Sequence, residues 1–321
     1  MSHPAPPTTG PAAAADQLMA AIERCRAPVC VGLDPVIDRL PAALQPASAT
    51  GEAACRAIER FCEGVVDAAL PHVPAIKPQS ACFERFGSGG VAVLERICQR
   101  IRAGGGIVIL DVKRGDIGTT AAHYGAAAAA MGAHWMTASP YLGMDGIDPL
   151  LEAGLGVFAL VRTSNPSGDQ LQSTPVMPRS SGGSTASASP TASPTASPTA
   201  LAPATSVADV VGEMIREAGA AHLGERGWSG LGAVVGATRP VDAANHRASL
   251  PQQPFLVPGY GAQGGGVADV LPCFRDGEGA IVTASRSVIY APAPAGTDWT
   301  GAVAAAAEQL ASDVGSATGA R

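Results

Sequence analysis

A short charged series interrupts one of the most apolar segments of the chain. Residues 107–117 read Ile-Val-Ile-Leu-Asp-Val-Lys-Arg-Gly-Asp-Ile. Because strand side chains alternate between two faces, Asp111 and Lys113 share a face, and Asp116 follows three residues later, beyond the end of the predicted strand. Buried ions are costly unless each is paired or takes part in chemistry. The series therefore predicts either a structural ion pair at a strand end or a site that stabilises charge and moves a proton.

A glycine-rich segment at 258–266 could bind an anion. It reads Pro-Gly-Tyr-Gly-Ala-Gln-Gly-Gly-Gly. Glycines let backbone N–H groups approach a phosphate closely, although an ordinary flexible turn has the same composition. A later apolar run ends in Ser285 and Arg286, which brings a guanidinium beside this loop if the two strands are neighbours. Together the two features favour a phosphorylated ligand.

Two further charged residues end apolar runs. Lys77 closes the run Ala-Ile-Lys, and Asp34 follows Val-Gly-Leu. Taken alone, the lysine could simply reach solvent from a strand end, and the aspartate could cap a turn or a helix. Their positions become informative only together with the other strand ends.

Short apolar runs alternate with longer alanine-rich stretches that have helical character. The eight predicted strands are Pro28–Asp34, Ala75–Gln79, Ile107–Lys113, Trp135–Ser139, Val157–Ser164, Leu231–Ala237, Phe255–Tyr260 and Ala280–Ser285. The predicted helices are Glu52–Ala69, Gly90–Ala103, Thr119–Met131, Val207–Leu223, Val241–Ala248, Val267–Arg275 and Trp299–Val314. Eight β/α units predict an α/β fold of the (β/α)8 TIM-barrel type, with a doubly wound open sheet as the alternative. The charged residues at the carboxyl ends of the runs favour the barrel, because barrel active sites lie there.

Residues 173–206 break this alternation with Ser-Gly-Gly-Ser and Ala-Ser-Pro-Thr repeats. Such a composition cannot bury enough apolar surface to offset its conformational entropy, so we predict a disordered Ser/Pro/Thr/Ala-rich insertion after the fifth strand. We expect a flexible segment at 1–19, a single catalytic domain at 20–315 and a C-terminal tail at 316–321. The insertion is expected to be a solvated bystander, so that deleting 175–204 leaves turnover nearly unchanged.

Composition and charge narrow the ligand classes. A chain of 321 residues can hold a TIM barrel, which typically takes about 250 residues. The net charge of −6 and the lack of a long Lys/Arg cluster argue against a nucleic-acid partner. The start of the chain does not read as a secretory leader, and no apolar run reaches the roughly 18 residues of a membrane span. We therefore expect a cytoplasmic protein with a small ligand and no membrane partner. The seven cysteines are scattered without a Cys-x-x-Cys pair, so neither a disulfide framework nor a zinc site is expected.

The spaced motifs resemble those of orotidine 5'-phosphate decarboxylases. The run Asp111-x-Lys113-x-x-Asp116-Ile117 is similar to the Asp-x-Lys-x-x-Asp signature of that family, in the Lys-Arg-Gly-Asp-Ile form of its second subgroup. The resemblance spans roughly residues 20–291. It also includes Gly32-Leu33-Asp34, Lys77, Thr163-Ser164-Asn165-Pro166, the Gly261–Gly265 loop and Arg286-Ser287.

The resemblance implies a metal-free and cofactor-free decarboxylation of orotidine 5'-monophosphate to UMP, the last step of de novo pyrimidine synthesis. It assigns the charged network to Lys77, Asp111, Lys113 and Asp116, with Asp116 reaching into the site of the partner subunit of a homodimer. Asp34 and Lys77 would hold the ribose hydroxyls.

The same resemblance implies the remaining substrate contacts. Thr120 would reach the ribose from the partner subunit, Ser164 would bond the pyrimidine, and Gln263 and Arg286 would grip the phosphate. The full set of expected substrate-binding residues is Asp34, Lys77, Ile117, Thr120, Ser164, Gln263, Gly264 and Arg286.

Two other functions remain open on the residues alone. A metal-dependent sugar-phosphate lyase or epimerase can use a similar Asp-x-Lys run, but it needs metal-binding carboxylates at further strand ends. Lys77 in the second run and Ser139 at the end of the fourth are poor ligands for magnesium. A non-catalytic nucleotide-binding or interaction protein that works through its Ser/Pro tract would leave Lys77 and the charged series at 111–116 unexplained.

Overall fold

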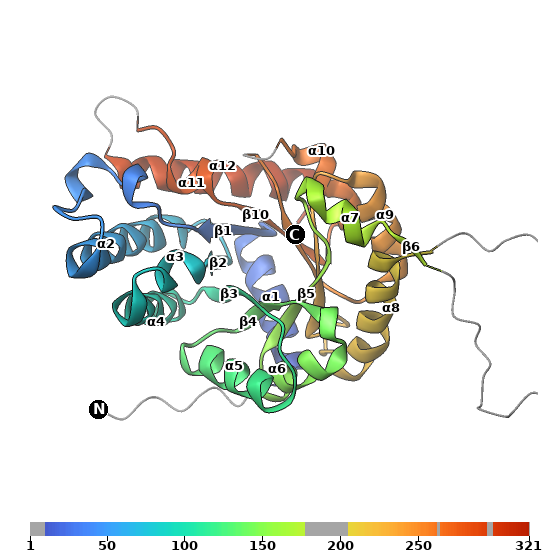
Figure 1. The fold of residues 1–321 in the computed structure, drawn as a ribbon. Coiled ribbons are helices and arrows are strands. Elements are labelled where there is room, and N and C mark those ends of the chain that lie inside the picture. The colour runs from blue at the N-terminus through green and yellow to red at the C-terminus, as the bar shows by residue number, and fades with distance from the viewer. Residues whose placement is uncertain (1–9, 177–204, 262–263, 294–297, 321) are drawn as a thin grey trace, which may run out of the picture.

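Eight parallel strands close into a barrel surrounded by helices (Figure 1). The computed structural model describes residues 10–176, 205–261, 264–293 and 298–320. The barrel strands are β1 Val29–Leu33, β2 Ala75–Pro78, β3 Ile107–Arg114, β4 Trp135–Ala138, β5 Gly156–Arg162, β8 Leu231–Val235, β9 Phe255–Pro258 and β10 Ala280–Ala284. Strand β1 pairs with both β2 and β10, so the sheet has no edge. The predicted TIM barrel is confirmed, and the open-sheet alternative is wrong.

The helices follow the strands in the order expected for β/α units. They are α1 Pro11–Cys25, α2 Gly51–Ala69, α3 Ala81–Glu84, α4 Gly87–Ala103, α5 Gly118–Ala130, α6 Asp148–Glu152, α7 Asp169–Gln172, α8 Val207–Gly219, α9 Pro240–Ser249, α10 Val267–Val270, α11 Arg286–Ile289 and α12 Trp299–Thr318. Short 3-10 turns are η1 Ile37–Arg39, η2 Ala42–Leu44, η3 Pro140–Leu142, η4 Met144–Gly146, η5 Pro166–Gly168, η6 Ala220–His222 and η7 Leu271–Cys273. The predicted C-terminal tail begins three residues too early, because α12 extends through Thr318.

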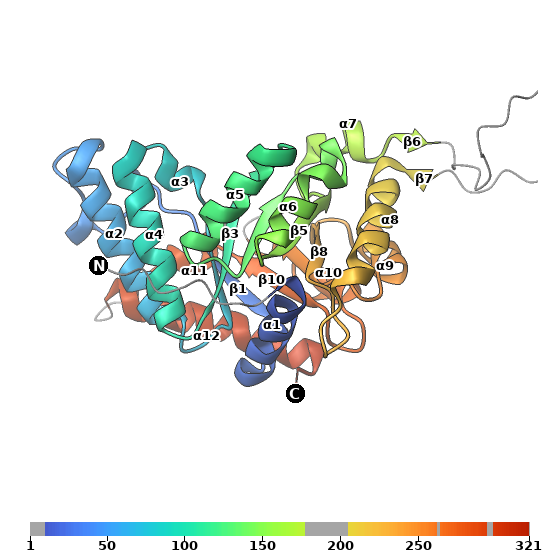
Figure 2. The same ribbon diagram turned by 90° about the horizontal axis from the view of Figure 1, so that it is seen from below.

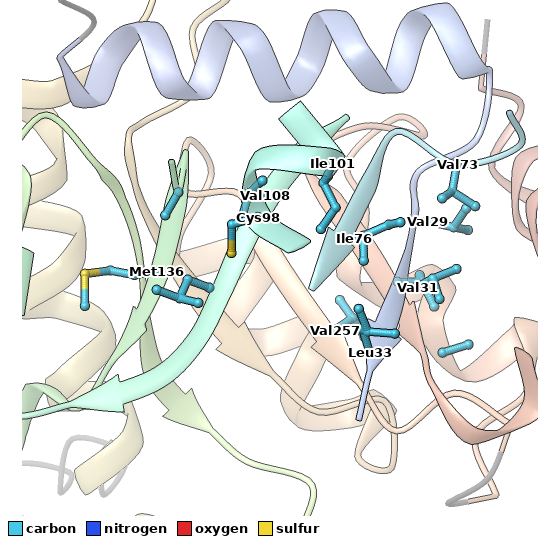
Figure 3. Close-up of a cluster of buried hydrophobic side chains, with 14 of the residues drawn as sticks. Val29, Val31, Leu33, Val73, Ile76, Cys98, Ile101, Val108, Met136 and Val257 are labelled. Carbon is cyan, nitrogen blue, oxygen red and sulfur yellow. The ribbon is translucent and has the colours of Figure 1, made fainter. Parts of the chain in front are cut away.

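The alternation of strand side chains divides the core into two layers. Val29, Val31 and Leu33 of β1 belong to the cluster that packs against the surrounding helices (Figure 3). Cys30 belongs to a second cluster that draws at least one residue from every barrel strand, which places it inside the barrel. Each large apolar side chain buried in this way contributes about 1.5–3 kcal/mol. The two layers fix which residues of each strand face inward toward the site.

Helix α1 covers the amino-terminal end of the barrel (Figure 2). Ala15 and Leu18 are fully buried in the inner cluster, and the Trp135 indole donates to the Ala14 carbonyl over 3.2 Å. The prediction of a flexible segment at 1–19 is therefore wrong for residues 11–19, while 1–9 lie outside the described residues. Since this end is closed by apolar packing, the open end is the carboxyl end of the strands.

The insertion enters after β5, as predicted. Its two ends are joined by a short antiparallel pair, β6 Pro175–Val176 with β7 Thr205–Ser206, in which Val176 lies opposite Thr205. Ser206 then caps α8 by accepting a hydrogen bond from the Asp209 backbone N–H. Residues 173–176 and 205–206 are thus ordered, contrary to the predicted range, and 177–204 lie outside the described residues. None of the helices in the described part of the chain combines the length and apolar character needed to cross a membrane.

Candidate active site

The carboxyl ends of β2 and β3 bring two lysines onto one buried carboxylate. Asp111 Oδ2 accepts from Lys77 Nζ over 2.5 Å and from Gln79 Nε2 over 3.1 Å. Asp111 Oδ1 accepts from Lys113 Nζ over 2.5 Å and from Thr137 Oγ1 over 2.9 Å. Four donors therefore occupy the four lone-pair directions of this carboxylate. We call Lys77, Asp111 and Lys113 the lysine network.

The charges of the lysine network keep each other ionised. Burial on its own would raise the pKa of Asp111, but the ammonium charges of Lys77 and Lys113 and their hydrogen bonds outweigh it and hold that pKa well below its usual range. Burial likewise opposes the charged form of Lys77, yet Asp111 and Asp34 raise the pKa of this lysine above its usual value. Asp111 is therefore an anion and Lys77 a cation across the physiological range.

Lys113 differs from its two partners in exposure. Its side chain is 47% exposed, whereas those of Lys77 and Asp111 are 8% and 7% exposed. An ammonium has three donors, and Asp111 is the one acceptor that Lys113 Nζ contacts among the described residues. The lysine network thus presents a cation with free donors at the open end of the barrel.

Asp116 does not join the network within its own chain. Its side chain is exposed, and its Oδ1 accepts from the Ile117 backbone N–H over 2.8 Å. Among the described residues no ion pair links Asp116 to Lys113. Ile117 and Thr120 are exposed on the same loop and the start of α5. The predicted contribution of Asp116 and Thr120 across a dimer interface stays a prediction.

Asp34 lies just beyond β1, on the other side of Lys77. Ser285 Oγ donates to Asp34 Oδ2, and the Tyr290 hydroxyl donates to the Asp34 carbonyl over 3.2 Å. The same Tyr290 oxygen accepts from the Val36 backbone N–H over 2.7 Å, which ties α11 to the segment after β1. Asp34 Oδ1 is buried and has no hydrogen-bond partner among the described residues. One carboxylate oxygen of Asp34 is therefore an acceptor without a donor among the described residues.

The glycine-rich loop lies beside Arg286, as the neighbouring strands predicted. Strands β9 and β10 are paired, and a Cβ built on Gly261 would lie 3.4 Å from Ser287 Oγ, at the start of α11. Gly264 has φ of +92°, a conformation that favours glycine, and its N–H donates to the Gly261 carbonyl over 2.9 Å. Arg286 is exposed and forms no ion pair with any described residue. Gln263, the other predicted phosphate ligand, lies outside the described residues.

The segment that carries Ser164 is held by a second charged cluster. Buried Arg162 donates to Asp242 over 2.8 Å and to Asp169 over 2.6 Å, and Arg239 also pairs with Asp169. We call Arg162, Asp169, Arg239 and Asp242 the arginine network. Ser164 itself is partly exposed. The arginine network therefore fastens the start and the end of the 163–169 turn to α9.

The comparisons with known proteins agree with this geometry. A model of the Orotidine 5'-phosphate decarboxylase / HUMPS family matches residues 27–181. The orotidine 5'-phosphate decarboxylase of Rhodopirellula baltica is 35% identical over 292 residues, which cover 86% of this chain and 88% of that protein. That of Verminephrobacter eiseniae is 39% identical over 303 residues, covering 92% and 95%. This chain belongs to the orotidine 5'-phosphate decarboxylase family. The solved structure of Leishmania donovani OMP decarboxylase is 29% identical and matches with a TM-score of 0.71, covering 96% of this chain and 99% of that one.

Family membership separates the two catalytic hypotheses. The metal-dependent sugar-phosphate lyase or epimerase is not favoured, because the relatives at this identity are decarboxylases. Within the described part of the chain, no three His, Cys, Asp or Glu side chains are grouped so as to hold a metal ion.

Several polar residues of this decarboxylase site escaped sequence reasoning. Gln79 and Ser285 are the last residues of predicted strands, so their positions carried a signal that could have been used. Thr137 sits inside an apolar run and Tyr290 directly follows a short helix, and nothing local marks either. Their roles depend on atoms supplied by other strands.

Proposed function

We propose that this protein decarboxylates orotidine 5'-monophosphate to UMP and carbon dioxide, the last step of de novo UMP biosynthesis. The observation that carries the proposal is the Lys113 ammonium, held on ionised Asp111 with free donors facing the open end of the barrel. This arrangement suits a reaction that develops negative charge and then takes up a proton.

Lys113 supplies both needs of the reaction. When the bond between C6 and the carboxylate carbon breaks, the electron pair stays on C6, and the ring offers no adjacent electron sink. The positive charge of Lys113 stabilises this carbanion, and a proton then moves from Nζ to C6. The neutral amine regains a proton from solvent, so the cycle closes without a redox step. Asp111 keeps the ammonium aimed, since its other donors hold the carboxylate in place.

The other end of the substrate is held by three loops. We assign the phosphate to Gly264, Gln263 and Arg286, which follow β9 and β10. We assign the ribose hydroxyls to Asp34 and Lys77, and the unpartnered Asp34 Oδ1 supports this role. Binding energy gained at these remote groups can be used to orient the reacting carbon, so a substrate without the phosphate should lose rate as well as affinity.

The substrate would meet residues from both subunits. We assign Ser164 to the pyrimidine and Ile117 to an apolar contact with the substrate, with Thr120 of a partner subunit completing the ribose site.

We further propose a homodimer in which Asp116 reaches the site of the partner subunit. Exposed apolar side chains lie near Asp116: Ile117 is 48% exposed, Tyr141 76% and Leu142 50%. A Cβ on Gly146 would lie 2.8 Å from the Asp116 carbonyl, so the two segments that carry these residues are neighbours. An exposed apolar patch of this kind is typical of an interface.

We propose the cytoplasm as the place of action. All seven cysteines are free thiols, which fits a reducing compartment.

The test follows the absorbance of orotidine 5'-monophosphate with purified protein in the presence of a chelator. We expect rapid loss of substrate with the native chain and almost none with Lys113→Ala, because the cation and proton donor is gone. Arg114→Gln is the matched control, since Arg114 is the next residue but pairs with Glu84 instead. A native protein that is well folded and inert would overturn the proposal and return the choice to a metal-dependent barrel enzyme.

A further inference from the structure

The ladder between β3 and β4 is interrupted next to the lysine network. Leu110 pairs with Met136, and the next pair is Arg114 with Ala138, so four residues of β3 advance along two residues of β4. Lys113 has φ of +46°, in the left-handed region that residues other than glycine rarely adopt. Such a bulge redirects side chains and leaves backbone donors without ladder partners. Something must therefore hold the backbone of residues 111–113.

The Thr137 hydroxyl is what holds it. The backbone N–H groups of Val112 and Lys113 both donate to Thr137 Oγ1 over 3.0 Å. These two bonds use both lone pairs of the hydroxyl, and its single proton goes to Asp111 Oδ1 over 2.9 Å. Thr137 is only 1% exposed, so water has little access to replace these bonds. One hydroxyl thus links the backbone that carries Lys113 to the carboxylate that pairs with its ammonium.

We propose that Thr137 is a positioning residue that sets the distance and angle between Asp111 and Lys113, an inference that rests on the proposed decarboxylase function. Without its hydroxyl, two partly buried N–H groups lose their acceptor and the strained turn at Lys113 relaxes. A displacement of about 1 Å at a reacting group costs about 100-fold in rate. The predicted phosphate and pyrimidine contacts follow β5, β9 and β10, so most contacts that hold the substrate lie away from this turn.

The test compares Thr137→Val with Thr137→Ser. Valine keeps the shape but removes the hydroxyl, so we expect kcat to fall about 100-fold while KM stays within about threefold. Serine keeps the hydroxyl and should restore kcat to within about threefold of the native value. Thr283→Val is the matched control, because Thr283 also faces the barrel interior, is 6% exposed, and has no hydrogen-bond partner for its hydroxyl among the described residues.

Hydrogen exchange of the Val112 and Lys113 amides gives a readout independent of turnover. We expect both amides to exchange faster in Thr137→Val, but at native rates in Thr137→Ser and Thr283→Val. An active native enzyme whose Thr137→Val variant keeps its kcat would overturn this inference and leave the proposed function standing. Native protein that does not turn over the substrate would overturn the proposed function instead.

Discussion

The lysine network and the arginine network both lie at the carboxyl end of the barrel, but they use their hydrogen bonds differently. Arg162 is 5% exposed, and Asp169, Asp242 and Gln172 accept from its donors on every side. Lys113 is 47% exposed and meets a single carboxylate among the described residues. Each nitrogen of Arg162 therefore has an acceptor, whereas two N–H donors of Lys113 are left without one among the described residues, at the open end of the barrel.

This difference indicates that the arginine network has a structural role and the lysine network a chemical one. A buried guanidinium with a hydrogen bond from each of its three nitrogens is costly to disturb and holds the turn that bears Ser164. The Lys113 ammonium is half exposed, and Asp111 keeps its bonds to Lys77, Gln79 and Thr137 when Lys113 gives up a proton. Proton transfer from Lys113 therefore need not disturb the position of Asp111. We therefore expect substitutions in the arginine network to affect stability, and those at Lys113 to affect turnover.

The largest expected effect is on turnover. Lys113→Ala should lower kcat by about 10⁴-fold, because it removes the group that we propose both stabilises the carbanion and donates the proton. The free energy of unfolding should change by less than about 1 kcal/mol, since the side chain is half exposed. Steady-state assays and urea unfolding of the same preparation measure both quantities. A large loss of stability in Lys113→Ala would contradict the proposed difference between the two networks.

The arginine network should show the opposite pattern. Arg162→Met removes the buried partner of Asp169 and Asp242 and should lower the free energy of unfolding by about 1.5–3 kcal/mol, because its charged hydrogen bonds are lost. Arg96→Met is the control, because the Arg96 side chain is 52% exposed in its pair with Glu59, and such surface pairs contribute about 1 kcal/mol or less. The free energy of unfolding of both variants is measured by urea unfolding. Equal losses would show that the ion pairs of Arg162 contribute no more to stability than a surface pair.

Part of the loss of stability in acid should come from His134, which belongs to neither network. Burial lowers the pKa of His134 to about 4 from its ordinary value near 6.5. As the pH falls, His134 is protonated in the unfolded chain before it is protonated in the folded protein. The stability that neutral His134 contributes is therefore full above pH 6.5 and is lost as the pH falls toward 4. Native protein should lose up to about 3 kcal/mol more than His134→Gln between these values. Parallel losses in the two proteins, measured by urea midpoints at pH 7 and 4.5, would contradict this assignment.

The smallest effect is expected at the insertion. Val176 and Thr205 are already opposite each other, so an Asn-Gly turn can replace residues 177–204 and close a two-residue hairpin. We expect kcat within about twofold of the native value, because the β6–β7 pair and the arginine network keep the Ser164 turn in place. A loss of tenfold or more would show that the insertion takes part in the reaction.

Local patterns were enough to predict most of the barrel. Each predicted strand overlaps an observed barrel strand, because alternation and apolar runs depend on a few neighbouring residues. Helix α1 was missed although its alanine-rich sequence and the proline at its first position favour a helix. Its burial could not be predicted, because it depends on the barrel end that the helix covers. The short helices α3, α6, α7 and α11 were missed for a similar reason: each is four or five residues long.

The sequence by itself determined the eight β/α units, the shared face of Asp111 and Lys113, and the charged residues at strand ends, because these follow from periodicity along one segment. Only the tertiary structure decided that Lys77 and Lys113 share Asp111, that Ser285 meets Asp34 from 251 residues away, and that Thr137 supports a bulge in the neighbouring strand. These contacts join atoms from different strands. Their geometry is set by barrel closure and by the register between strands, which no single segment encodes.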